Sequence, residues 1–377
     1  MSLEQTPLDE TTLPPAVRNA VAATVAPQMR MVVARGMAPL SPPDLLVALY
    51  QLLVSGDDEL RDAADKTARE LPDAVLQAGL PAIADPRVLD WFGVALVRRD
   101  KPLQLVLSNQ RTADETFASL AALAGDAVLE QLALNEQRLL RHPAIITALY
   151  LNPRTRMSTA MRAVELAVRN GVEVTGIPSF EEVKAAIEHD GAPPPETDGV
   201  FAAALELGAD VAPPGVPLDE QTAEQQAEAA VKLAEDLANG RASDNTDVGR
   251  LPLSAKLRLC AIGNAFHRAQ LVRDSNKVIA VAAVRSPSLT DQEAERYSGL
   301  RALHEEVIRY LATQRQFTKR YSVKLNLVNN PKCPLSLAVN FLAHLTAKDL
   351  KQLSRSKSVP SALTKAAQGL LQKREPR

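Results

Sequence analysis

The hexapeptide YLNPRT at residues 150–155 lies between two apolar runs, and a close copy, VNNPKC, occupies residues 328–333. Looser copies are LSNQRT at residues 107–112 and VRSPSLT at residues 284–290. The Asn or Ser of the four copies falls at positions 109, 152, 286 and 330, which gives spacings of 43 and 44 residues within the two pairs. Each copy follows one helical pattern and precedes another. The sequence therefore predicts an all-α fold whose helical repeats are hinged at this segment.

The residues of the hinge explain why a helix ends there. A residue before a proline is excluded from the helical region by clash with the ring, so helices are predicted to end near Asn152 and Asn330. Asn also tolerates the left-handed conformation and can bond its own backbone, which suits a helix C-terminus. Shortly after two of the hinges, residues 112–115 and 290–293 match the Thr-x-x-Glu capping box that starts a helix.

Composition favours thin helical layers. The 377 residues are 46% hydrophobic but only 3% aromatic, and stacked helices can pack on Leu, Ala and Val without many rings. The only tryptophan, Trp91, is predicted to lie in the core. After the second hinge, Met157, Met161, Val164 and Val168 form one apolar helical stripe that is also predicted to be buried.

The chain shows no sign of membrane insertion or secretion. Its longest strong apolar run, residues 45–54, is half the length that a bilayer requires, and the N-terminus lacks a basic and an apolar signal region. Cys260 and Cys333 are far apart and are expected to be buried thiols. We therefore expect a cytoplasmic protein without membrane contact.

Charge divides the chain into three parts. Residues 1–173 form a predicted N-terminal helical block, with residues 1–15 as a loose tail. Residues 174–250 hold 16 acidic and 4 basic residues and several proline runs, which predicts a largely disordered acidic linker. Residues 251–377 form a second helical block with 22 basic and 8 acidic residues.

No catalytic constellation is present. The chain has no glycine-rich phosphate loop, no HExxH and no GxSxG, and its five histidines are scattered. The sequence around His189, Glu-His-Asp, has the residue types of a metal site, but neighbouring residues point in different directions around a helix. We expect no enzymatic activity, no cofactor and no metal, and no residue indicates a small-molecule substrate.

Basic residues at repeated positions are the candidate binding residues. Arg111, Arg154 and Lys332 stand two residues after a hinge Asn, so they would line one edge of a stack; Ser288 interrupts this ladder. A second cluster lies between two helices of the basic block, and a similar cluster occurs one repeat earlier. The full candidate set is Arg111, Arg154, Arg268, Arg273, Lys277, Arg315, Lys319, Arg320, Lys324 and Lys332.

The two helical blocks resemble HEAT/armadillo-type α-solenoids, in particular divergent bacterial ones with Asn-Pro-Arg/Lys-Thr hinges and no assigned activity. The resemblance covers residues 1–173 loosely and residues 251–377 more fully, and Cys333 departs from it by replacing the capping Thr. It implies a non-enzymatic scaffold or adaptor that binds another protein through its repeat surface. The alternative is binding of nucleic acid by residues 251–377, with the acidic linker masking this block.

Overall fold

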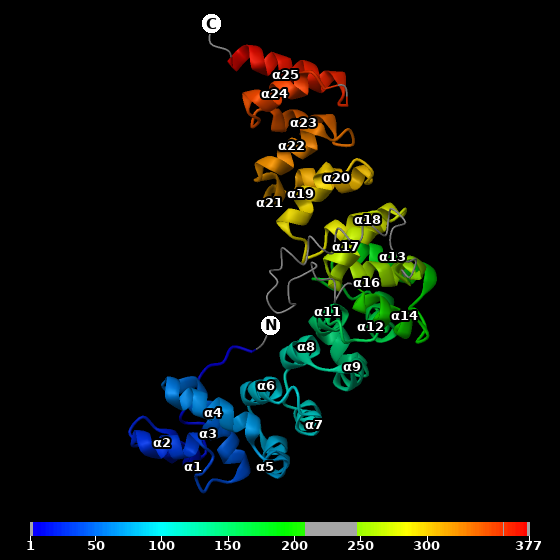
Figure 1. Ribbon diagram of the computed structural model, residues 1–377. Helices are drawn as coiled ribbons and strands as arrows, with labels where there is room; N and C mark the ends of the chain where they lie inside the picture. Colours follow the sequence, from blue (N-terminus) through cyan, green and yellow to red (C-terminus); the bar gives the residue numbers. More distant parts are fainter. Residues whose placement is uncertain (1–2, 208–246, 357, 375–377) are drawn as a thin grey trace, which may run out of the picture. The chain divides into compact units, whose positions relative to one another are not determined.

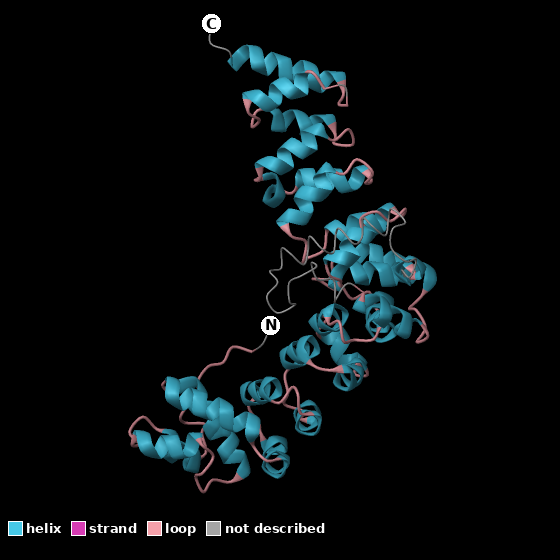
Figure 2. Ribbon diagram, in the orientation of Figure 1, coloured by secondary structure: helices cyan, strands magenta, loops and turns pink. Residues whose placement is uncertain are grey.

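The computed structural model describes residues 3–207, 247–356 and 358–374, and every regular element among them is a helix (Figure 1, Figure 2). There are 24 α-helices and two short 3₁₀ helices in these residues. The chain divides into two compact units, Met1–Gly176 and Ile177–Arg377. The predicted all-α fold is therefore confirmed for the part of the chain that the structure describes.

The first unit holds twelve α-helices. They are α1 (Pro15–Val21), α2 (Pro27–Ala34), α3 (Pro42–Ser55), α4 (Asp58–Glu70), α5 (Asp73–Gly79), followed by η1 (Leu80–Ala82), α6 (Pro86–Ala95), α7 (Asp100–Ser108), α8 (Asp114–Leu123), α9 (Asp126–Ala133), α10 (Glu136–Arg141), α11 (Ala144–Leu151) and α12 (Met157–Arg169). Local signals set several starts. Prolines begin α1, α2, α3 and α6, and the Asp57 carboxylate accepts the Leu60 N–H at the start of α4.

The second unit begins with α13 (Phe180–Asp190) and α14 (Thr197–Glu206). After residues 208–246, which are not described, come η2 (Asp247–Arg250), α16 (Leu253–Ile262), α17 (Ala265–Leu271), α18 (Lys277–Val284), α19 (Asp291–Gly299), α20 (Glu305–Thr313), α21 (Arg315–Thr318), α22 (Tyr321–Asn329), α23 (Leu335–Leu342), α24 (Ala347–Ser354) and α25 (Ser361–Arg374).

The prediction of a largely disordered linker is wrong for residues 180–206. Acidic composition concealed a short apolar stripe: Val183, Ala186 and Ile187 are buried on α13, which packs against α16. Phe201 of α14 is buried too, and α14 contacts η2. The remainder of the predicted linker lies outside the described residues.

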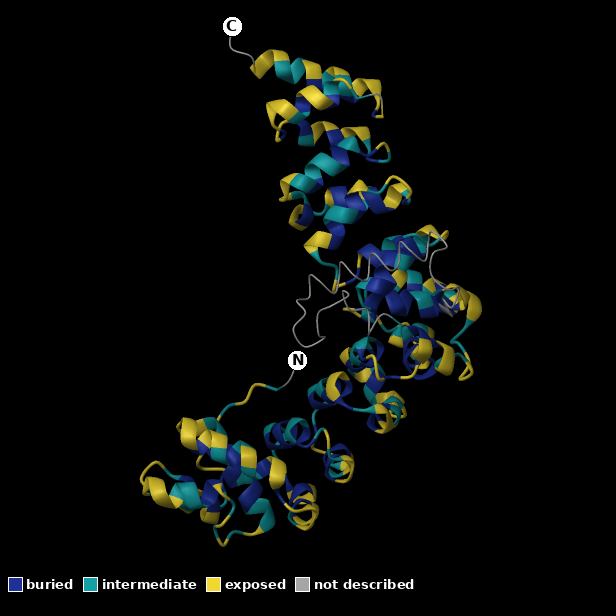
Figure 3. Ribbon diagram, in the orientation of Figure 1, coloured by how far each residue is buried: buried dark blue, intermediate teal, exposed yellow. Residues whose placement is uncertain are grey.

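Within each unit, helices pack mainly against helices one to three places away along the chain. α3 packs against α4 and α5, and α8 against α11; in the second unit α16 packs against α18 and α19 against α22. In Figure 3 the buried residues lie on the sides where these helices meet. Trp91 is buried beside Phe92, with ring centroids 4.6 Å apart, as predicted for a core residue. This pattern of contacts is compatible with a helical repeat.

The three hinge asparagines end their helices in an extended conformation. Asn109, Asn152 and Asn330 have φ of −71°, −75° and −89° with ψ near 120°, and they cap α7, α11 and α22. The predicted helix ends near Asn152 and Asn330 are confirmed, and neither Asn uses the left-handed conformation that this residue tolerates. At two of the three sites a proline follows, and its ring forces the preceding residue into the extended region.

The hinge asparagine also links two helices, through contacts that we call the asparagine clamp. The side-chain amide donates to two carbonyls at the end of a neighbouring helix, over 2.8–3.3 Å: Asn109 to Leu80 and Ile83, Asn152 to Ala121 and Ala124, and Asn330 to Ser298 and Leu300. Its Oδ1 accepts the backbone N–H two residues later, at Arg111, Arg154 or Lys332. One Asn side chain thus bonds both the end of the neighbouring helix and the backbone of its own hinge.

The clamps at Asn152 and Asn330 each close on the helix that follows the preceding hinge. The hinge at Asn109 precedes α8, and the end of α8 is held by Asn152. The hinge at Ser286 precedes α19, and the end of α19 is held by Asn330. The 43 or 44 residues between two hinges therefore contain the helix whose end the second hinge contacts.

At the Ser286 hinge the clamp is replaced. The Ser286 hydroxyl is buried and has no hydrogen-bond partner among the described residues, since its side chain is shorter than that of Asn. The guanidinium of Arg268 instead donates to the Gly263 carbonyl at the end of α16, at 2.9 Å, and forms a two-bond ion pair with Glu293. Arg268 and Glu293 are both buried, so the charges satisfy each other.

Two further helix ends are held in the same way. Arg374 stands 44 residues after Asn330 and donates to the Ala343 and Leu345 carbonyls after α23. At the end of α14, Asn264 donates to the Leu207 carbonyl, and His267 bonds the Ala204 carbonyl. Different side chains therefore meet one requirement, the pairing of carbonyls at helix ends.

One of the two predicted capping boxes forms. Thr290 and Glu293 bond each other's backbone N–H groups at the start of α19. The prediction at Thr112 is wrong, because its hydroxyl donates back to the Val106 carbonyl of α7 at 2.5 Å, and Ala113 precedes α8 without a side-chain cap.

The predicted loose tail is instead attached to the first unit. We call residues 3–14 the strap. Its residues Leu8 and Leu13 are buried in the core of the first unit, and Gln5 donates to the buried Asp90 at 2.9 Å. Burial raises the pKa of Asp90, and hydrogen bonds from Thr116 and Gln5 oppose this rise. The prediction failed because the strap has no periodic pattern and is held by polar contacts to distant helices.

We predict that Asn152→Ala lowers the free energy of unfolding of the first unit by about 3 kcal/mol, since it leaves two buried carbonyls without their donor. Urea unfolding followed by circular dichroism measures the change. Asn170→Ala is the matched control, because Asn170 is exposed and its side-chain amide donates to the Leu166 carbonyl of its own helix. A loss for Asn152→Ala no larger than the control's, below about 0.5 kcal/mol, contradicts the role of the clamp.

We predict that His267 makes the second unit sensitive to acid. Its Nδ1 accepts the Asn264 N–H and its Nε2 donates to the Ala204 carbonyl, so the ring is neutral. Burial lowers its pKa from 6.5 to about 4. A folded pKa below the unfolded one means that the contribution is present above pH 6.5 and is lost as pH falls toward 4.

The wild-type chain should therefore lose about 2 to 3 kcal/mol relative to His267→Gln between pH 7 and pH 4.5. Gln retains a donor and does not titrate. Equal pH dependence of the two unfolding free energies, measured by urea titration at each pH, would be evidence against a buried neutral histidine.

Candidate functional site

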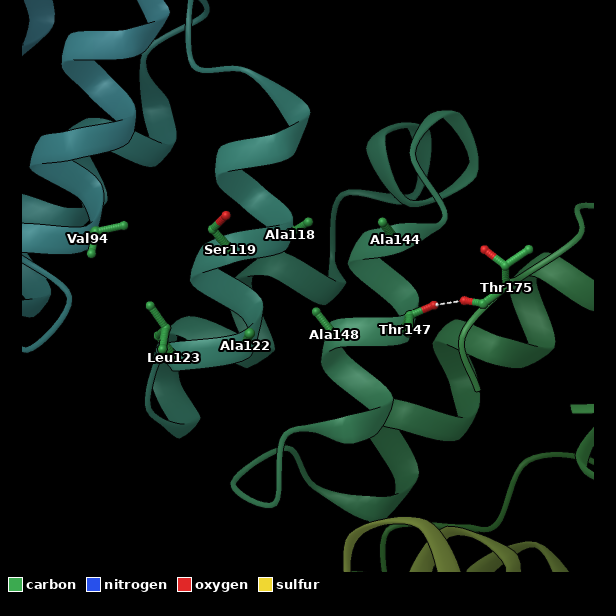
Figure 4. Close-up of a pocket in the computed structure, with 9 residues that line it drawn as sticks. All are labelled: Val94, Ala118, Ser119, Ala122, Leu123, Ala144, Thr147, Ala148 and Thr175. Carbon is green, nitrogen blue, oxygen red and sulfur yellow. Dashed lines mark hydrogen bonds between the residues drawn. The ribbon is translucent and has the colours of Figure 1, made fainter. Parts of the chain in front are cut away.

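A groove of about 520 Å³ crosses α6, α8 and α11 on the first unit (Figure 4). The residues that line it are Val94, Ala118, Ser119, Ala122, Leu123, Ala144, Thr147, Ala148 and Thr175. None of them carries a charge. In Figure 4 side chains of the three helices face a common space, so a single ligand can touch all three.

Small residues create the groove. Ala118 and Ala122 of α8, like Ala144 and Ala148 of α11, are four residues apart and therefore lie on one face of their helix. Ala122 and Ala144 are exposed, Ala148 is partly exposed and Ala118 is buried, while Leu123 is 53% exposed. An open apolar surface of this kind suits the apolar face of a protein segment.

A tight loop forms one end of the groove. The Thr147 hydroxyl donates to the Thr175 carbonyl at 2.7 Å. The next residue, Gly176, has φ of +89°, and a Cβ there would lie 3.1 Å from the Thr147 methyl group. Gly176 therefore allows the loop to approach α11 closely.

The predicted sites did not include this groove. The available signal was the pair of alanines at i and i+4 in the two helices α8 and α11 that Asn152 joins. Alanine is common in helices, so the spacing alone did not separate an exposed face from a core face. Only the packing of α8 against α11 shows which alanines stay accessible.

Of the three cations in the predicted basic ladder, one makes a structural hydrogen bond and two are exposed. Arg111 and Arg154 are exposed at their hinges. Lys332 donates through its ammonium group to the Leu303 carbonyl at 2.5 Å, so it holds the preceding loop. Two of the three cations therefore remain accessible, and the third has a structural contact.

Four predicted cations come together between α21 and α22. Arg315 begins α21, Lys319 and Arg320 connect the two helices, and Lys324 is on α22. Arg315 and Lys319 are exposed, and no carboxylate in the described residues pairs with them or with Lys324. Arg320 is paired with Asp291 at 3.1 Å. We call Arg315, Lys319 and Lys324 the basic turn.

The similar cluster one repeat earlier is not an open basic surface. Arg268 lies in the core against Glu293 and cannot reach a surface ligand, so it is removed from the candidate set. Arg273 is partly buried and donates to the Ala269 carbonyl. Lys277 is exposed, 4.0 Å from Glu306.

The reactive groups of the described residues are dispersed or buried. No group of three His, Cys, Asp or Glu side chains in the described ranges is arranged to hold a metal ion. Cys260 and Cys333 are buried thiols, and burial raises the pKa of Cys333 to about 11. In the same part of the chain, no helix is both long and apolar enough to cross a membrane.

Comparison with protein-family models, curated proteins and solved structures finds no match to this chain. The asparagine clamps, the groove and the basic turn are therefore the features from which a function can be argued.

Proposed function

We propose that the protein is a non-enzymatic, cytoplasmic scaffold that binds another protein in the groove over α6, α8 and α11. The groove itself supports this proposal: it is apolar, open and shared by three helices of one unit. The occupant that fits is a helix or extended segment with a narrow apolar face, because the alanine lining leaves room for large side chains from the partner.

The proposal extends to the architecture. Hinges that recur at 43 or 44 residues, with Asn152 and Asn330 bonding the ends of the helices that follow the preceding hinges, fit a HEAT-like α-solenoid. In such a repeat the buried polar contacts fix the layers, and the outer faces remain free to bind.

We predict that Ala122→Arg blocks binding in the groove. Ala122 is exposed, so the long side chain should enter the groove without disturbing the core. The matched control is Ala127→Arg on the neighbouring helix α9, where the residue is also exposed but outside the groove.

Proteins retained from native lysate by each immobilised chain are compared by quantitative mass spectrometry. A partner retained in stoichiometric amount by the wild type and by Ala127→Arg should fall at least about tenfold with Ala122→Arg, the equivalent of about 1.4 kcal/mol. Recovery of nucleic acid without any stoichiometric protein, or equal retention by both variants, contradicts the proposal.

The basic turn supports a second candidate function, the binding of nucleic acid by the second unit. Arg315, Lys319 and Lys324 are close in the chain, and no described acidic side chain neutralises them. Such unpaired cations can contact phosphates, which makes binding dependent on salt.

This candidate predicts that Arg315→Glu with Lys319→Glu weakens binding of a fluorescein-labelled 24-base-pair DNA duplex by at least about tenfold and lowers the salt slope by about 2. The control pair is Lys348→Glu with Lys351→Glu on α24, which makes the same change of charge at exposed positions. Fluorescence anisotropy from 50 to 300 mM salt measures both. An equal loss for the two pairs would indicate net charge alone, and flat curves for the wild type would remove this candidate.

A further inference from the structure

A small cavity in the first unit is lined by residues of the strap and of helices α1, α2 and α3. Its volume is about 210 Å³. Part of the wall is apolar and includes Leu8 and Leu13 of the strap, together with Val21 at the end of α1. This space is smaller than the sites that hold drug-sized ligands, so it fits a ligand of only a few non-hydrogen atoms.

Two arginines line this cavity, and one of them carries a buried donor without a partner. Arg30 of α2 is partly buried, and its Nε has no hydrogen-bond partner among the described residues. A buried polar group that lacks a partner costs free energy, so a ligand that accepts this bond is favoured. Arg18 of α1 uses one nitrogen, Nη2, for the Thr11 and Leu13 carbonyls, both at 3.2 Å.

A third donor belongs to a buried side chain of the wall. Gln51 of α3 lines the cavity and is only 6% exposed. Its Oε1 accepts the Leu8 N–H at 2.9 Å, which fixes the orientation of the amide. The other end of the amide, Nε2, has no acceptor in the described part of the chain. Buried side-chain amides ordinarily have partners, so Gln51 independently points to an accepting ligand.

The charges of the lining favour a ligand with a single negative charge. Two guanidinium groups and one carboxylate, that of Glu10, line the cavity. Glu10 is exposed and forms no ion pair with a cation of the described residues. Asp9 is next to it in the chain but is not part of the lining, and its carboxylate accepts the Thr11 N–H at 2.8 Å. One positive charge of the lining is therefore left for the ligand.

We propose that this cavity binds a short-chain monocarboxylate whose carboxylate lies between Arg18 and Arg30. A planar guanidinium group binds a carboxylate through paired hydrogen bonds, which supplies the acceptor that Arg30 Nε lacks. Gln51 Nε2 donates to the same carboxylate. The hydrocarbon tail packs against Leu8 and Leu13, so the strap forms one wall of the site. This site shares no residue with the groove over α6, α8 and α11.

The test uses the full, nitrogen-15-labelled chain and sodium butyrate as the probe, with sodium chloride added to keep the ionic strength constant. Two-dimensional NMR follows the Leu8 backbone amide and the Arg30 Nε–Hε signal, which is assigned by its absence from Arg30→Met. We expect both signals to shift saturably with a Kd on the order of 1 mM, which a ligand of six non-hydrogen atoms can reach. Shifts that stay linear with butyrate concentration would overturn the proposal.

Arg30→Met should weaken butyrate binding at least about tenfold, as read from the Leu8 amide, because it removes the guanidinium but keeps an unbranched side chain. The control is Arg35→Met, which makes the same change of charge at an exposed position just after α2 and outside the cavity. An equal Kd for the two variants would contradict the site.

Gln51→Glu tests the third donor. It keeps an acceptor for the Leu8 N–H and replaces Nε2 by an oxygen, so butyrate binding should again weaken at least about tenfold. Unchanged binding would exclude Gln51 from the site. If this variant does not fold, Arg30→Met decides the matter, because the Arg30 side chain makes no hydrogen bond within the described residues and can be replaced without loss of one.

A comparison of anions tests the class of ligand. Acetate should bind about tenfold more weakly than butyrate, the loss expected for two buried methylene groups. Inorganic phosphate should also bind more weakly, because it has no apolar part and carries more than one charge at pH 8. Equal binding of acetate and butyrate would contradict the apolar wall, and phosphate binding as tight as that of butyrate would contradict a carboxylate ligand. None of these results depends on the groove over α6, α8 and α11.

Discussion

The pairing of backbone carbonyls at helix ends is the constraint on which both units depend. The last carbonyls of a helix have no partner within that helix, and water cannot reach them where the next helix covers the end. At several helix ends in the described residues, a residue that ends a later helix approaches these carbonyls. A side chain placed there can donate across the gap, and Asn152 does so to two carbonyls at once.

The requirement is geometric rather than specific to one amino acid. Asn bonds the carbonyls directly at three hinges, Arg374 reaches them from the last helix, and Asn264 and His267 share the task after α14. The Ser286 hinge is the most informative exception. Its short side chain leaves the task to Arg268, and a buried cation then requires Glu293, which also caps α19. Glu293 thus serves both the buried ion pair and the cap of α19.

The sequence predicted these features to the extent that they are local. The Asn-Pro pairs, their spacing and the Thr290 cap depend on neighbouring residues, and the helix ends lie where they were predicted. Arg374 was missed because an arginine near the C-terminus has no distinctive pattern. Arg268 was taken for a surface cation because burial depends on a partner, Glu293, 25 residues away.

Nonlocal contacts also explain why two segments predicted to be disordered, the strap and the segment that holds α13, are packed in the structure. The strap has no periodicity, yet Gln51 and Arg87 hold its backbone from helices far along the chain. Helix α13 is acidic overall, but its few apolar residues face α16. Composition averages over a segment, whereas folding depends on which few side chains find a partner. The groove was not predicted for the same reason, since its lining comes from three helices that are separate in the sequence.

The buried polar contacts and the outer faces of the helices have different roles. The hinge clamps use buried polar groups to fix the helices, so substitutions on the outer faces leave them intact. The strap is held by the same chemistry. Tyr50, Gln51 and Arg87 pair with its backbone groups, and Leu8 packs into the core. Tyr50 and Gln51 are themselves buried, so this pairing attaches the strap to the core of the first unit. The hinges and the strap therefore meet the same requirement, because in both places a side chain from one segment pairs with the backbone of another.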